Sequence, residues 1–215
     1  MKLATYFRSS AAYRVRIALN LKGLAYEPEF VHLLRNGGEQ HAPAYRARNA
    51  AELVPLLETD EGELLTQSLA IIEYLDETVL TPKLLPGDAL QRARIRAFAL
   101  AIACDIHPLD NLRVLRRLKR VHGQEQAAID DWYRHWIAVG LPALEDMLAR
   151  GSGEGPFCFG SEPTLADICL VPQMANARRY ECPLEAFPRL LRADAAARAL
   201  PAFEAAAPEH QPDAD

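Results

Sequence analysis

The stretch TYFRSSAAYRVRIALNLK, residues 5–22, has the pattern of a strand, a turn and a helix. An apolar run up to Phe7 ends at Arg8, and Ser9 and Ser10 precede a long segment of good helix formers. Serine hydroxyls accept hydrogen bonds from the unpaired amides of a first helical turn, so both serines stand where a helix cap is expected. The helix has one apolar face, and we therefore expect it to pack on a sheet.

The same helix start favours an anion. Free N–H groups, two hydroxyls and a neighbouring arginine all attract negative charge. The alternative is that Ser9 and Ser10 only cap the helix and that Arg8 is solvated, which is the commoner role of serines before a helix. The stretch alone leaves both interpretations open.

Around this stretch, the first 80 or so residues have the order of a small α/β domain. The expected elements are a strand at 2–7, a helix at 11–22, a strand at 26–33, a weakly helical stretch at 39–48, a hairpin of 53–58 with 63–66, and a helix at 68–79. The strand–helix–strand order implies a parallel, right-handed crossover.

A linker with two prolines and a glycine follows at residues 81–88, and no convincing strand appears beyond it. The expected elements are a long helix at 88–120 bent at Pro108, a helix at 124–149, a glycine-rich loop at 151–160, and a helix opened by the capping box Thr164–Asp167. The last ten or so residues are expected to be frayed. The predicted domains are therefore 1–82, α/β, and 88–215, all-helical.

Composition narrows the function classes. A formal net charge of −5 argues against a nucleic-acid partner. There is no apolar run of about 18 residues that could span a bilayer, and no signal-peptide pattern follows Met1. The four cysteines and six histidines show no metal-site spacing, so we expect no metal and reduced thiols in a cytoplasm.

Several motifs resemble the cytosolic glutathione transferases: Val54-Pro55, the sequence LTQSLAIIEYLDE at 65–77, and the capping box in the helical half. That family has a thioredoxin-like α/β domain followed by an all-α domain. More narrowly, SSxxxRVRIAL at 9–19 and VPQxANAxR at 171–179 resemble the zeta class, which contains maleylacetoacetate isomerases and maleylpyruvate isomerases. The resemblance covers essentially the whole chain.

The resemblance implies that glutathione is the coenzyme. The residues expected to bind it are Ser10, Gln40, Val54, Pro55, Gln67, Ser68, His107, Asn111 and Arg113. It also implies a cis peptide at Val54-Pro55 that pairs with the cysteinyl part, and the helix start at Gln67-Ser68 suits the glutamyl carboxylate. The alternatives are an ordinary edge-strand proline, a simple serine cap and a structural His107.

The reactive group would be the glutathione thiolate, whose pKa falls near a helix N-terminus. Ser10, or else Ser9, is expected to hold the sulfur, because Tyr6 lies on the strand and Tyr13 is already inside the helix. Ala11 departs from the zeta pattern, which has cysteine at this position. A mechanism that uses that cysteine is therefore excluded.

A maleyl substrate is a cis-alkene flanked by carboxylates, so its site needs cations. Arg8 and Arg179 are the candidates, since arginine binds carboxylates bidentately. Arg178 lies about 100° away around the helix and matches the motif less well. The alternative for Arg179 is a surface salt bridge.

We therefore expect a glutathione-dependent cis–trans isomerase that converts maleylacetoacetate or maleylpyruvate to the fumaryl isomer by reversible thiolate addition. The sequence CDIHPLDN, with Arg113, favours maleylpyruvate slightly. The alternatives are a general glutathione transferase or dehalogenase acting on α-halo acids, and a non-catalytic interaction protein of the same fold. The resemblance also implies a homodimer that acts on a small dicarboxylate.

Overall fold

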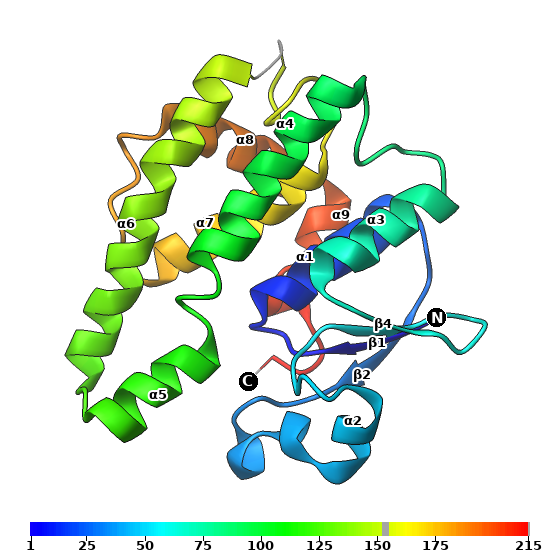
Figure 1. Cartoon of the computed structure of the whole chain (residues 1–215). Coiled ribbons are helices and arrows are strands. Elements are labelled where there is room, and N and C mark those ends of the chain that lie inside the picture. Colours follow the sequence, from blue (N-terminus) through cyan, green and yellow to red (C-terminus); the bar gives the residue numbers. More distant parts are fainter. Residues whose placement is uncertain (152–154, 215) are drawn as a thin grey trace. The chain divides into compact units, whose positions relative to one another are not determined.

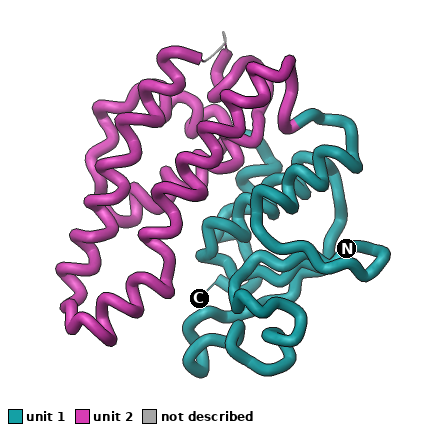
Figure 2. Tube along the Cα trace, viewed as in Figure 1, with its two compact units in different colours: residues 1–83, 199–215 teal, residues 84–198 magenta. Residues whose placement is uncertain are grey.

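The computed structural model describes residues 1–151 and 155–214. The chain forms two compact units, shown in Figure 2: unit 1 comprises Met1–Lys83 and Ala199–Asp215, and unit 2 comprises Leu84–Arg198. This division differs from the predicted boundaries at the C-terminal end, because the last residues pack with the first unit. The predicted fold class, a thioredoxin-like domain followed by a helical one, is confirmed.

Unit 1 contains a four-stranded sheet. Its strands are β1 (Lys2–Thr5), β2 (Glu27–Phe30), β3 (Leu56–Glu58) and β4 (Leu64–Thr66), in the order β2-β1-β3-β4. β1 pairs with β2 in parallel, and β3 is antiparallel to both β1 and β4. The predicted parallel pairing of the first two strands and the predicted hairpin are thus confirmed. Leu3 on the central strand β1 lies opposite Leu57 on β3, and both are fully buried.

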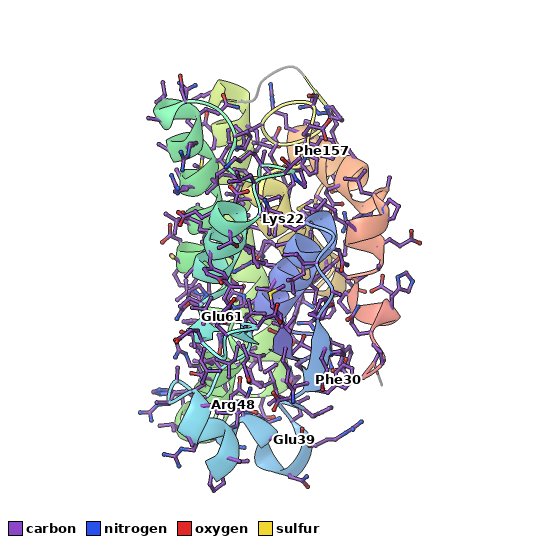
Figure 3. The ribbon with its side chains drawn as sticks, turned by 90° about the vertical axis from the view of Figure 1, so that its right-hand side faces the viewer. Lys22, Phe30, Glu39, Arg48, Glu61 and Phe157 are labelled. Atoms are coloured by element: carbon purple, nitrogen blue, oxygen red, sulfur yellow. The ribbon has the colours of Figure 1, made fainter. Side chains whose placement is uncertain are left out.

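Two helices of unit 1, α1 (Ser10–Leu21) and α3 (Ser68–Thr78), pack against each other on one face of the sheet. The short α2 (Pro43–Arg48) lies on the other side in Figure 1. Lys22, labelled in Figure 3 at the end of α1, donates from Nζ to Asp76 Oδ1 of α3 at 2.7 Å. Figure 3 also shows Arg48 on α2, where its guanidinium pairs with Glu29 of β2 at 2.8 Å.

The C-terminal residues complete unit 1. They form α9 (Pro201–Glu204) and a short 3-10 turn at Pro208–His210. The predicted fraying of the last ten or so residues is wrong, because Ala206 is fully buried and the tail is hydrogen-bonded to the first helix and the turn before it. Asn20 Nδ2 donates to the Ala202 carbonyl oxygen at 3.0 Å, and the backbone N–H of Phe7 donates to Asp213 Oδ2 at 2.9 Å.

The regular elements of unit 2 are all helical among its described residues. Its elements are α4 (Ala89–Leu100), a π-helical stretch η3 (Ala101–Ile106), α5 (Leu112–His122), α6 (Gln126–Gly151), α7 (Leu165–Arg179) and α8 (Pro188–Arg198). The single helix predicted at 88–120 is wrong. The chain leaves the helix at residues 107–111, where Pro108 lacks an N–H, and Asn111 then caps α5 by accepting from the Arg113 N–H at 3.1 Å.

The helix predicted at 124–149 is confirmed as α6, and the capping box is confirmed at the start of α7. Part of the predicted glycine-rich loop, residues 152–154, lies outside the described residues. The sequence predicts no bilayer-spanning segment. Among the described residues, none of the helices is long and apolar enough to cross a membrane.

Candidate active site

The turn between β1 and α1 contains the first candidate residues. Ser9 caps α1, since its Oγ accepts from the Ala12 N–H at 3.2 Å. Ser10 is the first residue of the helix and is only 9% exposed. Arg8 is exposed, with its guanidinium carbon 6.0 Å from the centroid of the Phe7 ring. The predicted capping role is therefore confirmed for Ser9, and the role of Ser10, the first helical residue, towards a ligand stays a prediction.

The start of α3 has an unusual backbone. Gln67 has a φ of +68°, and its side chain makes no capping hydrogen bond with any residue that the structure describes. Behind it, the buried Arg14 of α1 donates from Nη1 to Ser68 Oγ at 3.4 Å. A helix N-terminus with a nearby guanidinium suits a carboxylate. Sequence reasoning missed Arg14, although two arginines among the apolar residues of this helix, Arg14 and Arg16, were the available signal.

The segment before β3 is held rigidly. The Val54–Pro55 peptide bond is cis, as the resemblance implies. The preceding carbonyl oxygen, that of Leu53, accepts from the Tyr45 hydroxyl at 2.6 Å and from Asn49 Nδ2 at 2.7 Å. These two bonds fix the backbone of Val54 without using its own polar groups. The role of this backbone in binding remains a prediction.

Gln40 is buried, with 5% of its surface exposed. Its Nε2 lies 3.1 Å from His41 Nε2, whereas its Oε1 has no hydrogen-bond partner among the described residues. Gly38, two residues earlier, has a φ of +116°, a backbone conformation that favours glycine, and the Gln40 side chain lies against it. A buried carbonyl oxygen without a partner can accept a hydrogen bond from a ligand.

Three candidates of unit 2 lie close together around the start of α5. His107 is half-buried just after the π-helical stretch, Asn111 is the cap of α5, and Arg113 is exposed in its first turn. The cap explains Asn111 structurally. Whether these three residues also bind glutathione remains a prediction.

Two adjacent arginines at the end of α7 make different contacts. Arg178 forms an ion pair with the buried Asp194 of α8. Arg179 instead lies over aromatic rings, with its guanidinium carbon 4.9 Å from the Tyr180 ring centroid and 5.9 Å from that of Tyr133. The salt bridge considered for Arg179 is thus made by Arg178. Arginine guanidinium groups commonly stack on aromatic faces in this way, and binding of a carboxylate by Arg179 stays a prediction.

Asp110, in the turn before α5, was not singled out from the sequence. It is 7% exposed, and neither carboxylate oxygen has a hydrogen-bond partner within the described residues. Burial raises the pKa of Asp110 to about 8. Burial also raises the pKa of Tyr133, with Asp110 adding to the rise and Arg179 opposing it. An aspartate in a proline turn resembles an ordinary cap, so the sequence offered no signal of its burial.

The described residues contain no group of three or more metal-ligating side chains. All four cysteines are free thiols, and burial raises the pKa of Cys158 well above its usual range. None of the four lies in the turn before α1. The polar candidate residues of the two units therefore carry hydroxyl, amide, guanidinium and imidazole groups, which suit binding of an anionic ligand.

Known proteins resemble this chain along both units. Models of the glutathione S-transferase N-terminal and C-terminal domains match residues 8–78 and 126–198. A probable maleylacetoacetate isomerase of Vibrio cholerae is 51% identical over 97% of this chain and 96% of its own length.

Two solved structures are similar throughout. A maleylpyruvate isomerase, described as a bacterial glutathione S-transferase of the zeta class, is 46% identical, with a TM-score of 0.96 and full coverage (100%) of both chains. The maleylacetoacetate isomerase of Anaeromyxobacter dehalogenans, solved with dicarboxyethyl glutathione and citrate in its active site, is 47% identical. Its TM-score is 0.87, over 100% of this chain and 97% of that one. This chain therefore belongs to the glutathione S-transferase family, within its zeta class.

Proposed function

We propose that the chain is an enzyme, a glutathione-dependent cis–trans isomerase that converts a maleyl keto acid, maleylacetoacetate or maleylpyruvate, to its fumaryl isomer. The observation that carries the proposal is full-length similarity to isomerases of both names, at 51% and 46% identity. Each unit adds support of its own. Unit 1 has helix starts suited to an anionic peptide, and unit 2 has an arginine held on aromatic rings.

Glutathione fits the polar groups of unit 1. Its glutamyl carboxylate suits the start of α3, where Gln67 and Ser68 lie above the buried Arg14. Its cysteinyl backbone suits the Val54–Pro55 edge of the sheet. The buried Gln40 Oε1, which lacks a partner among the residues described, can accept from an N–H of the peptide. In unit 2, His107, Asn111 and Arg113 are proposed as further contacts.

Bound glutathione would supply a thiolate that adds reversibly to the substrate double bond and so permits rotation about it. Ser10 would donate its hydroxyl hydrogen to the sulfur at the N-terminus of α1, where the helix dipole lowers a thiol pKa. Ser9 keeps that helix end capped. Arg8 and Arg179 would bind substrate carboxylates and stabilise developing negative charge.

The test is an absorbance assay of maleylpyruvate and of maleylacetoacetate, each with and without glutathione. We expect loss of the maleyl signal only with glutathione, with the coenzyme recovered unchanged. Consumption of glutathione with α-halo acids, without isomerisation, would indicate a transferase or dehalogenase instead. No glutathione-dependent reaction of any of these compounds would indicate a non-catalytic protein of this fold.

The role of Arg179 has its own test. Arg179→Ala should lower kcat/KM for isomerisation by about tenfold to a hundredfold, because a guanidinium that stabilises developing charge is lost. Arg150→Ala is the matched control, since this exposed arginine pairs across one helical turn with Asp146. A kcat/KM of Arg179→Ala within about twofold of the control would show that Arg179 has no such role.

We further propose a homodimer in a cytoplasm, with glutathione and a small dicarboxylate as its ligands. This follows from membership of the family rather than from a contact within the chain. Sedimentation of the purified protein tests the oligomeric state. We expect the mass of two chains, and the mass of a single chain would contradict the proposal.

A further inference from the structure

A buried arginine forms hydrogen bonds with the turn between β1 and α1. Arg16 of α1 is fully buried, with 0% of its surface exposed. Its Nη1 donates to Thr5 Oγ1 at 3.0 Å, and its Nη2 donates to the Phe7 carbonyl oxygen at 3.1 Å. Its Nε donates to the Ala206 carbonyl oxygen at 3.0 Å. One guanidinium therefore joins the end of β1, the turn and the C-terminal tail.

The tail also contacts the turn directly. Asp213 Oδ2 accepts from the backbone N–H of Phe7 at 2.9 Å, across 206 positions of sequence. Both backbone polar groups of Phe7 are therefore occupied, the N–H by Asp213 and the carbonyl by Arg16. Arg8, Ser9 and Ser10 follow immediately, so the residues proposed to act on thiolate and substrate begin one peptide unit beyond this attachment.

The negative charge of Asp213 favours the charged form of Arg16. Burial lowers the pKa of Arg16 to about 10, while Tyr26 and Asp213 raise it. Arg16 therefore remains a cation at neutral pH. A buried cation is tolerated only where its N–H groups are hydrogen-bonded, and here carbonyl and hydroxyl oxygens accept from all three nitrogens.

We propose that Arg16 and Asp213 form a clamp by which the C-terminal tail positions the turn that carries Arg8, Ser9 and Ser10. This inference rests on the proposed function of that turn. Arg16 and Asp213 are positioning residues, because neither is proposed to touch glutathione or substrate. A displacement of about 1 Å at a reacting group can cost about a hundredfold in rate, so a loosened turn would impair catalysis while the fold persists.

The experiment compares three variants of the full chain. Asp213→Ala removes the acceptor for the Phe7 N–H, and Asp213→Asn retains an oxygen that can accept it. Glu209→Ala is the matched control, because it removes one carboxylate from the same tail at an exposed position. The readouts are kcat and KM, the ultraviolet titration of glutathione thiolate bound to the enzyme, and hydrogen exchange of the Phe7 amide.

We expect Asp213→Ala to lower kcat about tenfold or more, to raise the pKa of the bound thiol and to speed Phe7 amide exchange, with the far-ultraviolet spectrum unchanged. Asp213→Asn should stay within about threefold of wild type, since its amide oxygen can replace the lost acceptor. Glu209→Ala should match wild type.

Equal behaviour of Asp213→Ala and Glu209→Ala in an active enzyme would overturn the clamp and leave the proposed function intact. A loss in Asp213→Asn as large as that in Asp213→Ala would also overturn it, because the hydrogen bond would then not be what holds the turn. A wild-type protein without glutathione-dependent activity would instead refute the proposed function. Exchange of the Phe7 amide then still decides whether the tail holds the turn.

Discussion

Two helix starts, one in each unit, satisfy their first-turn amides in opposite ways. At the start of α7, Thr164 Oγ1 accepts from the first-turn N–H of Ala166 at 3.3 Å. The fully buried Asp167 in turn accepts from the N–H groups of Thr164 and Cys158, both at 2.8 Å, and from Thr164 Oγ1 at 3.0 Å. At the start of α3, the Gln67 side chain forms no cap with the described residues, and its backbone has a positive φ.

The difference separates a structural helix end from one suited to a ligand. Amides that are already capped have no need of an external anion, whereas uncapped amides beside a buried guanidinium retain their affinity for one. The start of α1 lies between these cases, with Ser9 used as a cap and Ser10 at the first helical position. Strain at a non-glycine residue such as Gln67 is itself commonest at functional sites.

The largest expected effect is on stability, at the start of α7. Asp167→Ala should lower the free energy of unfolding by about 3 kcal/mol, because two buried N–H groups lose a charged acceptor. Denaturant unfolding measures this. Asp146→Ala, which removes an exposed carboxylate of α6, is the control and should change stability by less than about 0.5 kcal/mol. A change in the KM for glutathione in folded Asp167→Ala protein would break the distinction between the two helix starts.

Substitution of the two serines at the start of α1 should distinguish a role in catalysis from a role in capping the helix. Ser10→Ala should lower kcat/KM by about a hundredfold, as expected for loss of a hydroxyl that stabilises an anion. Ser9→Ala should cost about 1 kcal/mol of stability and less activity, because its Oγ is the cap of α1. Steady-state kinetics and thermal unfolding of both variants check this. The reverse pattern would assign the sulfur to Ser9.

The comparison extends to two buried carboxylates. Asp167 accepts three hydrogen bonds, whereas Asp110 accepts none from the described residues. Burial raises the pKa of Asp110 from its ordinary 3.8 to about 8, so the folded state binds more protons than the unfolded state between these values. Its stability contribution is complete below about pH 4 and is lost as pH rises through about 8.

Asp110→Asn should therefore be more stable than wild type at pH 9, by about 2 kcal/mol, and should gain little at pH 4. Thermal unfolding across this range checks the prediction. Parallel pH profiles for the two proteins would mean that the carboxylate acquires a partner in solution.

The smallest expected effect is at Gln67. Gln67→Gly adopts the same positive φ without a Cβ, so stability should stay within about 1 kcal/mol of wild type. Loss of the side chain should raise the KM for glutathione about tenfold, which corresponds to one hydrogen bond to a charged group. Kinetics at fixed substrate concentration measures it. An unchanged KM would assign the binding at this helix start to the backbone and Ser68 alone.

Local patterns sufficed for much of the fold and part of the site. The capping box at Thr164–Asp167, the hairpin after Val54-Pro55 and the cap at Ser9 all depend on residues within a few positions of each other, so sequence reasoning predicted them correctly. The single helix predicted at 88–120 with a bend at Pro108 is wrong, because the chain leaves the helix after Ile106 and Asn111 caps a new one, a local signal that the prediction did not use.

The sequence by itself determined the family, the order of the elements and the types of side chain at the candidate site, since these follow from short-range spacing. Only the tertiary structure decided the roles of the two arginines in the sequence RVR. Arg14 donates to Ser68, whereas Arg16 binds the turn at Phe7, to which Asp213 is also hydrogen-bonded. Burial and hydrogen bonding between residues some 200 positions apart depend on how the chain packs. A local pattern contains no record of that packing, so the tail that resembles a frayed end is part of the unit that carries the serines.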